Sequence, residues 1–152
     1  MLYYQRGSET DDLGAEGLQE GLFAALDKLG ERKKVLAIPP DFTRKHSFAG
    51  PLTGLADKYY GDALTDILPA LGTHAAMSDH EISEMFEGVS ADKFRVHNWR
   101  EDILTLGEVP SEYVSEVSGG VVSYSWPAQV NRLLTEGGFD LILSIGQVVP
   151  HE

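Results

Sequence analysis

The sequence contains no cysteine among its 152 residues. Disulfide bonds, thiolate catalysis and cysteine-held zinc or iron–sulfur sites are therefore excluded. It also has no apolar run of membrane-spanning length, and the N-terminus from Met1 to Arg6 leads into an acidic stretch instead of an apolar signal core. These absences predict a cytoplasmic protein without a membrane partner.

Positive charge is scarce as well. Lys and Arg number 12 against 24 Asp and Glu, which gives a formal net charge of -12 at pH 7. A field of this sign repels phosphate backbones, so nucleic acid is not an expected partner. The hydrophobic content of 42% and the charged content of 24% are those of an ordinary globular protein.

Several catalytic patterns are missing too. No dinucleotide-binding glycine fingerprint follows a predicted strand, and neither a phosphate-binding Gly-Lys-Ser/Thr loop nor a Gly-x-Ser-x-Gly motif occurs. The run from His80 to Glu84 is similar to a zinc-protease helix, but Glu84 stands where the second histidine would be. Glu81 is better explained as the partner of Ser78 in a capping box.

Apolar residues that are present recur in alternating helical and strand patterns. Helices are expected at 18–29, 51–60, 78–86 and 127–134, and strands at 35–38, 63–71, 94–96, once or twice within 108–124, and at 141–145. This alternation is typical of an α/β fold, here a mainly parallel sheet with helices on both faces. Residues 1–17 are expected to form a loose lead-in. Residues 18–152 are expected to form one α/β domain that is incomplete at its C-terminus, because the last strand leads into a loop that stops.

Polar side chains follow the first two predicted strands, at the ends where parallel sheets bind ligands. Arg44 can hold a carboxylate or phosphate in bidentate fashion, and Asp41 can orient Arg44 or accept a substrate hydroxyl. His74 follows Gly72 after the second strand, and the near-neutral pKa of an imidazole suits a general base. The alternative is structural, with Asp41 capping a polar turn and His74 closing one.

His151 follows the last predicted strand. Its alternative interpretation is an exposed terminal histidine. Two imidazoles at strand ends, facing each other across a ligand, would suit chemistry that must work on both faces of one carbon.

The order of these residues resembles that of the lactate racemase family, whose members use a nickel-pincer nucleotide. The resemblance covers nearly all of the chain from Val35 onwards. It rests on Asp41-Phe42-Thr43-Arg44, on Ala70-Leu71-Gly72-Thr73-His74 with Met77 to Glu81 behind it, on His97-Asn98, and on Asp140 to Gly146 leading to Pro150-His151.

The resemblance implies an isomerase that racemises or epimerises a small 2-hydroxy acid by reversible hydride transfer. In this family one histidine takes the hydroxyl proton while the pincer ring accepts the hydride, and a second histidine serves the opposite face of the carbon. Carried over by motif, His74 and His151 are this acid–base pair. Arg44 would contact the substrate carboxylate, and Asp41 would support the same loop.

For the cofactor, the resemblance implies contacts from Thr43, Gly72 and Thr73. The family's tethering lysine and nickel-binding histidine lie downstream of Glu152, as does a second domain. No metal ligand is therefore expected within this chain, and the fragment alone is expected to be inactive. Ala75 stands where relatives carry Arg, and Lys45-His46-Ser47 replaces a proline-containing continuation. A sugar acid is thus an alternative substrate to lactate.

Two other functions remain open. One is a non-catalytic module that binds a nucleotide or carboxylate and in which the histidines are structural. The other is a metal-dependent hydrolase using His74 and Asp41, for which closely spaced ligands are too few. The racemase hypothesis requires the side chains of Asp41, Arg44 and His74 to converge at one edge of the sheet.

Overall fold

The computed structural model describes residues 1–149, so the predicted base His151 lies outside the described residues. The chain forms two compact units. The first comprises Met1–Val96 and the segment from Phe139 onwards, and the second comprises His97–Gly138. The region predicted as one domain, 18–152, thus includes an insertion that forms a unit of its own.

Three parallel strands form the sheet of the first unit, in the order β2-β1-β5. They are β1 (Val35–Ile38), β2 (Leu64–Ile67) and β5 (Leu141–Ser144). The predicted strand 63–71 ends at Ile67, before Pro69, because proline has no N–H to donate to a sheet. The predicted fold class, α/β with a mainly parallel sheet, is confirmed.

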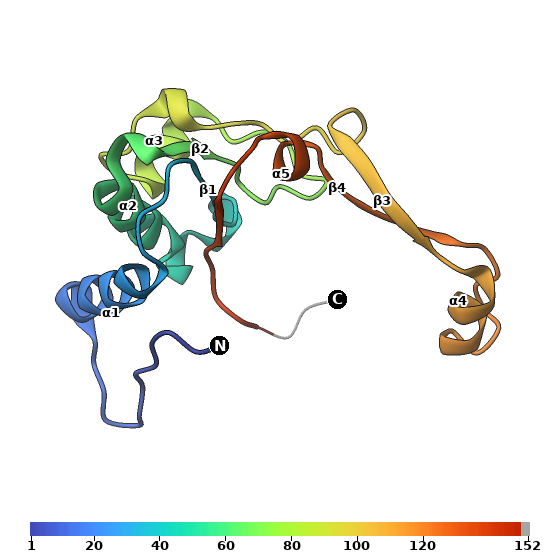
Figure 1. Cartoon of the computed structure of the whole chain (residues 1–152), viewed down its shortest axis with the longest axis horizontal. Coiled ribbons are helices and arrows are strands. Elements are labelled where there is room, and N and C mark those ends of the chain that lie inside the picture. Colours follow the sequence, from blue (N-terminus) through green and yellow to red (C-terminus); the bar gives the residue numbers. More distant parts are fainter. Residues whose placement is uncertain (150–152) are drawn as a thin grey trace. The chain divides into compact units, whose positions relative to one another are not determined.

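Three helices of this unit occupy segments with predicted helical spacing (Figure 1). They are α1 (Gly14–Leu29), α2 (Ala49–Tyr60) and α3 (Asp79–Met85). The capping box predicted at the start of α3 is present: the Ser78 hydroxyl accepts from the Glu81 backbone N–H at 3.3 Å, and the Glu81 carboxylate accepts from the Ser78 N–H at 2.8 Å. None of the helices in residues 1–149 combines the length and apolarity needed to cross a membrane.

The segment before α1 is shorter than the predicted lead-in, since α1 begins at Gly14 instead of Leu18. It is also held against that helix. A Cβ on Gly21 would come within 2.7 Å of the Tyr4 ring, so the aromatic ring lies directly on the helix backbone. Lys28 Nζ donates to the Tyr3 carbonyl at 2.6 Å. The predicted loose segment is therefore anchored along α1.

The core of the first unit lies between α1, α2 and one face of the sheet. Its fully buried members are Val35, Ala37, Ala56, Leu64 and Ile67, and side chains of α1 and α2 pack against them. On the other face of the sheet, β5 is partly open to solvent. Ile142 is 40% exposed, so the predicted cover on both faces of this strand is wrong within the described residues. The apolar run fits an edge strand whose buried face is formed by Leu141 and Leu143.

The second unit is an antiparallel ribbon of β3 (Ile103–Val109) and β4 (Trp126–Asn131), with the short helices α4 (Ser111–Val117) and α5 (Leu133–Glu136). The predicted helix 127–134 is wrong: Pro127 lies in β4, opposite Glu108. Both strands of a two-stranded ribbon are edges, where proline is tolerated. The predicted strands within 108–124 are also wrong beyond Val109, because α4 follows and no strand begins again before Trp126.

A third difference concerns residues 94–96. In place of the predicted strand, only a single parallel bridge joins Phe94 to Ile67. Arg95 Nε instead forms an ion pair with the buried Asp66 at 2.6 Å. This segment is therefore attached to β2 without extending the sheet by a full strand.

Candidate functional site

The loops after β1 and β2 leave the sheet side by side. Pairing continues beyond both strands, since the Ala70 N–H donates to the Pro39 carbonyl at 2.8 Å and Pro40 forms a bridge with Ala70. Carboxyl ends of parallel strands meet at one sheet edge, which is where α/β proteins bind ligands. The residues that follow Pro40 and Ala70 are therefore brought together at that edge.

Asp41 and His74 meet at this edge. Asp41 Oδ2 lies 2.5 Å from His74 Nδ1, within hydrogen-bond distance. The Asp41 side chain is 9% exposed, whereas the His74 side chain is 60% exposed. A carboxylate that accepts the Nδ1 proton selects the tautomer in which Nε2 is the acceptor. The pair therefore joins a fixed, buried anion to an imidazole whose second nitrogen can exchange protons with a ligand.

Thr43 holds the second oxygen of the same carboxylate. Asp41 Oδ1 accepts from the Thr43 hydroxyl at 2.5 Å and from the Thr43 backbone N–H at 3.0 Å. Asp41 is thus the N-cap of η1 (Phe42–Ser47), a short 3-10 helix. The capping role considered for Asp41 is present on Oδ1, while Oδ2 faces His74. Thr43 is predicted to contact the cofactor. In the structure its hydroxyl and its backbone N–H both donate to Asp41.

The pKa of Asp41 lies below its ordinary value of 3.8. Burial of the carboxyl group acts to raise this pKa, but the hydrogen bonds from His74 and Thr43 together outweigh it. Asp41 is therefore ionised at neutral pH. The carboxylate can then stabilise a positive charge that develops on the His74 ring.

We expect Asp41→Asn to lower the free energy of unfolding by about 1–3 kcal/mol at neutral pH, because the amide cannot replace the charged acceptor. A carboxyl group with a lowered folded-state pKa adds stability above its unfolded-state pKa of about 3.9, and loses it as pH falls through the folded-state pKa. Urea unfolding at neutral pH and near pH 2 should show the deficit shrink in acid. Asp62→Asn, at an exposed position in the turn after α2, is the control. A deficit independent of pH would contradict this account of Asp41.

Arg44 lies in η1, the same short helix as Thr43. Its backbone N–H donates to the Asp41 carbonyl at 3.1 Å, and its side chain is half-buried. Within residues 1–149, its guanidinium forms no ion pair. Of the two roles considered for Asp41, orienting Arg44 is not seen within the described residues, and Asp41 pairs with His74 instead. A cation remains available for a ligand on this loop.

Gly72 and Thr73 form the turn that leads to His74. Gly72 has a φ of 58°, in the left-handed region that favours glycine. The turn is closed by the His74 N–H, which donates to the Leu71 carbonyl at 2.9 Å. A Cβ on Gly72 would meet no atom within 4 Å, and Thr73 is exposed. This turn leaves open space beside the Asp41–His74 pair.

The segment after β5 leaves the sheet at the same edge. The Ile145 N–H donates to the Ile38 carbonyl at 3.0 Å, and a Cβ on Gly146 would lie 3.7 Å from Pro40.

Among the described residues, no cluster of three or more His, Asp or Glu side chains could hold a metal ion. His97, which belongs to the resemblance, lies in the second unit, where its Nδ1 is 2.9 Å from Asn131 Nδ2.

The fold and this site define an α/β protein with an Asp–His pair at the carboxyl edge of a parallel sheet. No family model and no curated protein matches the chain. A crystal structure of a Thermotoga maritima protein, determined by the Northeast Structural Genomics Consortium, is similar to it with a TM-score of 0.81 and 33% sequence identity. The similarity covers 96% of this chain, which spans only 36% of the Thermotoga protein.

Proposed function

We propose that this chain carries an acid–base site of a 2-hydroxy acid racemase or epimerase that depends on a nickel-pincer nucleotide and works in the cytoplasm. The observation that carries the proposal is the 2.5 Å contact between Asp41 Oδ2 and His74 Nδ1. Acid–base catalysis by histidine needs one ring nitrogen that is oriented by a partner and another that can reach the substrate. The buried Asp41 and the exposed His74 supply these two conditions.

In this proposal His74 Nε2 takes the proton of the substrate's 2-hydroxyl group and returns it in the reverse direction. Asp41 holds the ring and stabilises the imidazolium that forms, as the acid of a catalytic triad does. Arg44 binds the substrate carboxylate in bidentate fashion, because its guanidinium forms no ion pair within the described residues. Binding and proton transfer would thus come from two adjacent loops.

The open turn at Gly72 and Thr73 fits a bound nucleotide, because the backbone can be approached closely there and the exposed hydroxyl can hydrogen bond. The pincer group, when bound, supplies the acceptor for the hydride of the substrate's 2-carbon. The resemblance assigns the opposite face of that carbon to His151. It places the tethering lysine shortly downstream of Glu152, and the nickel-binding histidine and a second domain further on. In this proposal the chain's described residues bind the substrate, contact the nucleotide and move one proton, and His151 moves the other.

The proposal is tested with the product of the complete gene, whatever its length, purified with its cofactor. One enantiomer each of lactate and malate, and one aldonic acid, are incubated with it in D₂O and analysed by chiral chromatography and mass spectrometry. We expect interconversion with the original hydrogen retained on the 2-carbon, because a hydride does not exchange with solvent. Deuterium at that carbon would instead indicate proton abstraction and would contradict the proposal.

A carboxylate-binding module without chemistry uses the same Arg44 and predicts a different result. Calorimetry would then show binding that Arg44→Ala abolishes, while no acid is interconverted. Arg100→Ala is the control, because the Arg100 guanidinium stacks on Trp99 in the second unit at 3.8 Å from the ring centre.

A further inference from the structure

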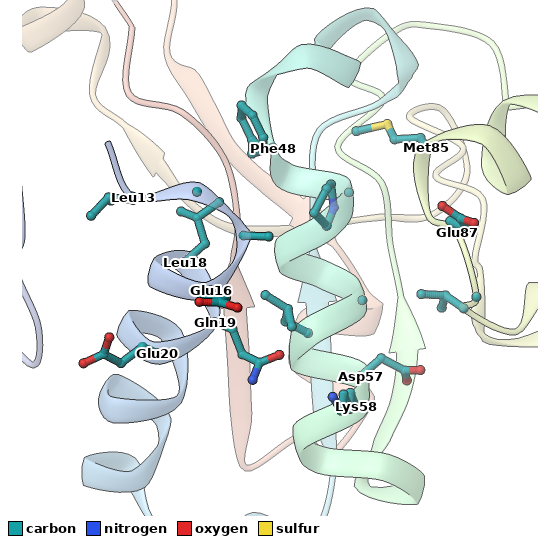
Figure 2. A pocket seen from close by; sticks show the side chains of 18 of the residues that line it. Leu13, Glu16, Leu18, Gln19, Glu20, Phe48, Asp57, Lys58, Met85 and Glu87 are labelled. Atoms are coloured by element: carbon teal, nitrogen blue, oxygen red, sulfur yellow. The ribbon is translucent and has the colours of Figure 1, made fainter. Parts of the chain in front are cut away.

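A groove of about 1460 Å³ runs over the outer face of α2 (Figure 2). Pro51 and Leu55 of α2 line it. Residues of α1 lie on one side of α2, and the end of α3 with the residues that follow it lies on the other. Neither Asp41 nor His74 lines it. Pockets for small molecules measure about 300–1,000 Å³. An open groove of this size fits a segment of protein better than a metabolite.

Two glycines of α2 allow the end of α3 and the residues after it to pack close to α2, and this packing shapes the groove. A Cβ on Gly50 would lie 1.9 Å from the Met85 carbonyl oxygen, so the two backbones are in direct contact there. One turn further on, a Cβ on Gly54 would meet the Val89 side chain at 3.7 Å. The surface between α1 and Val89 is mainly apolar, and Leu13 and Leu18 extend it along α1.

Phe48 stands at one end of the groove and carries the clearest sign of a partner. Its side chain is 60% exposed. Its φ of 61° makes it the one non-glycine residue with a positive φ among residues 1–149. A bulky side chain in this conformation costs on the order of 1–3 kcal/mol. The left-handed conformation belongs to the turn that joins η1 to α2, but it leaves the aromatic ring uncovered, and aromatic anchors dominate the binding energy of interfaces.

The rim of the groove specifies the charge of that partner. The acidic residues that line it are Asp11, Asp12, Glu16, Glu20, Asp57, Glu84 and Glu87, against the two cations Lys45 and Lys58. Glu84 is paired with Lys45, Asp57 with Lys93 and Glu20 with Arg6, so within the described residues the uncompensated acids of the rim are Asp11, Asp12, Glu16 and Glu87. A second copy of the chain, with its net charge of -12, would be repelled from this rim. A basic partner would be attracted.

We propose that the groove binds a basic amphipathic helix of another protein. Its apolar side would cover Phe48, Leu18 and Leu55, and its Lys or Arg side chains would face the acidic rim. A helix laid in a groove is a recurring mode of recognition, with anchors spaced three or four residues apart. This inference stands apart from the proposed racemase activity, because the groove and the Asp41–His74 pair share no residue.

The probe is a synthetic, fluorescently labelled peptide of roughly 18 residues, about 27 Å long as a helix, with Leu on one side and Lys on the other. Two comparison peptides have the same composition in scrambled order, or Glu in place of Lys. Fluorescence anisotropy should give a Kd at least tenfold lower for the amphipathic Lys peptide than for either comparison. Equal binding of the scrambled peptide would overturn the proposal, because charge alone would then account for the interaction.

Variants locate the binding site. Phe48→Gly should raise the Kd roughly tenfold or more, although it relieves the backbone strain and leaves the fold intact. Trp126→Ala, at another exposed aromatic position, should leave the Kd unchanged. The double variant Glu16→Gln, Glu87→Gln should weaken binding and flatten its salt dependence. An unchanged Kd for Phe48→Gly would overturn the proposal. So would a dimer in sedimentation that Phe48→Gly dissociates, since the groove would then belong to a second copy.

Discussion

Replacing His74 with alanine is expected to lower kcat for 2-hydroxy acid interconversion by roughly 10²- to 10⁴-fold, with KM changed far less. The imidazole is the group that moves the hydroxyl proton in the proposed function, whereas Arg44 supplies most of the attraction for the carboxylate. Initial rates over a range of substrate concentrations, measured by chiral chromatography, separate the two constants. The proposed role of His74 predicts a loss in kcat, not in binding.

His80→Ala is the matched control for this variant. His80 lies in α3 with its side chain 83% exposed, and it is 3.7 Å from Glu84. Its removal should leave both constants within about twofold, since a surface pair of this kind contributes little. If His74→Ala retained the activity of the wild type, the Asp41–His74 pair would be structural and the acid–base assignment would be wrong.

Gly50→Ala is expected to lower the free energy of unfolding by about 3 kcal/mol. The added Cβ would lie 1.9 Å from the Met85 carbonyl oxygen and 3.0 Å from its carbon. Both atoms belong to the backbone, so the clash cannot be relieved by rotating a side chain. Helix α2 and the end of α3 would have to separate, which disrupts the buried cluster formed by Ala49, Met85 and Phe86. Urea unfolding measures the loss.

Gly54→Ala, one helical turn away, is the control and should have the opposite sign. Its Cβ would make ordinary contacts, at 3.7 Å to Val89 and 3.9 Å to the Glu87 carbonyl. Alanine is favoured over glycine inside a helix by up to about 1 kcal/mol. Similar destabilisation by both variants would show that general loss of glycine flexibility matters, instead of the close approach at Gly50.

The first unit was predictable because its signals are local. The helical spacing of 51–60 and the capping box at Ser78 specify α2 and α3 from within a few residues. The second unit was not, because the pairing of Trp126 with Val109 joins distant segments and overrides the helix start suggested by Pro127. Long-range strand pairing leaves little trace in a local pattern.

The candidate site, too, could be predicted from the sequence only in part. Residues at the ends of parallel strands could be selected from the sequence, since that edge binds ligands in many α/β folds. The partner of Asp41 could not, because Arg44 is near in sequence whereas His74 becomes near only when β1 and β2 pair. Likewise the close approach at Gly50 and the backbone conformation of Phe48 depend on packing that no local pattern encodes.

The central strand β1 acquires its two neighbours at very different times during synthesis. β2 follows it after η1 and α2, whereas the hydrogen bond that joins Lys34 to Asp140, at the start of β5, spans 106 residues. The whole second unit must leave the ribosome before β5 can pair. Until then one edge of a buried apolar strand is open to other chains. Because His97–Gly138 forms a compact unit, the connection between the two strands is effectively shorter, which lowers the entropy lost when the sheet closes.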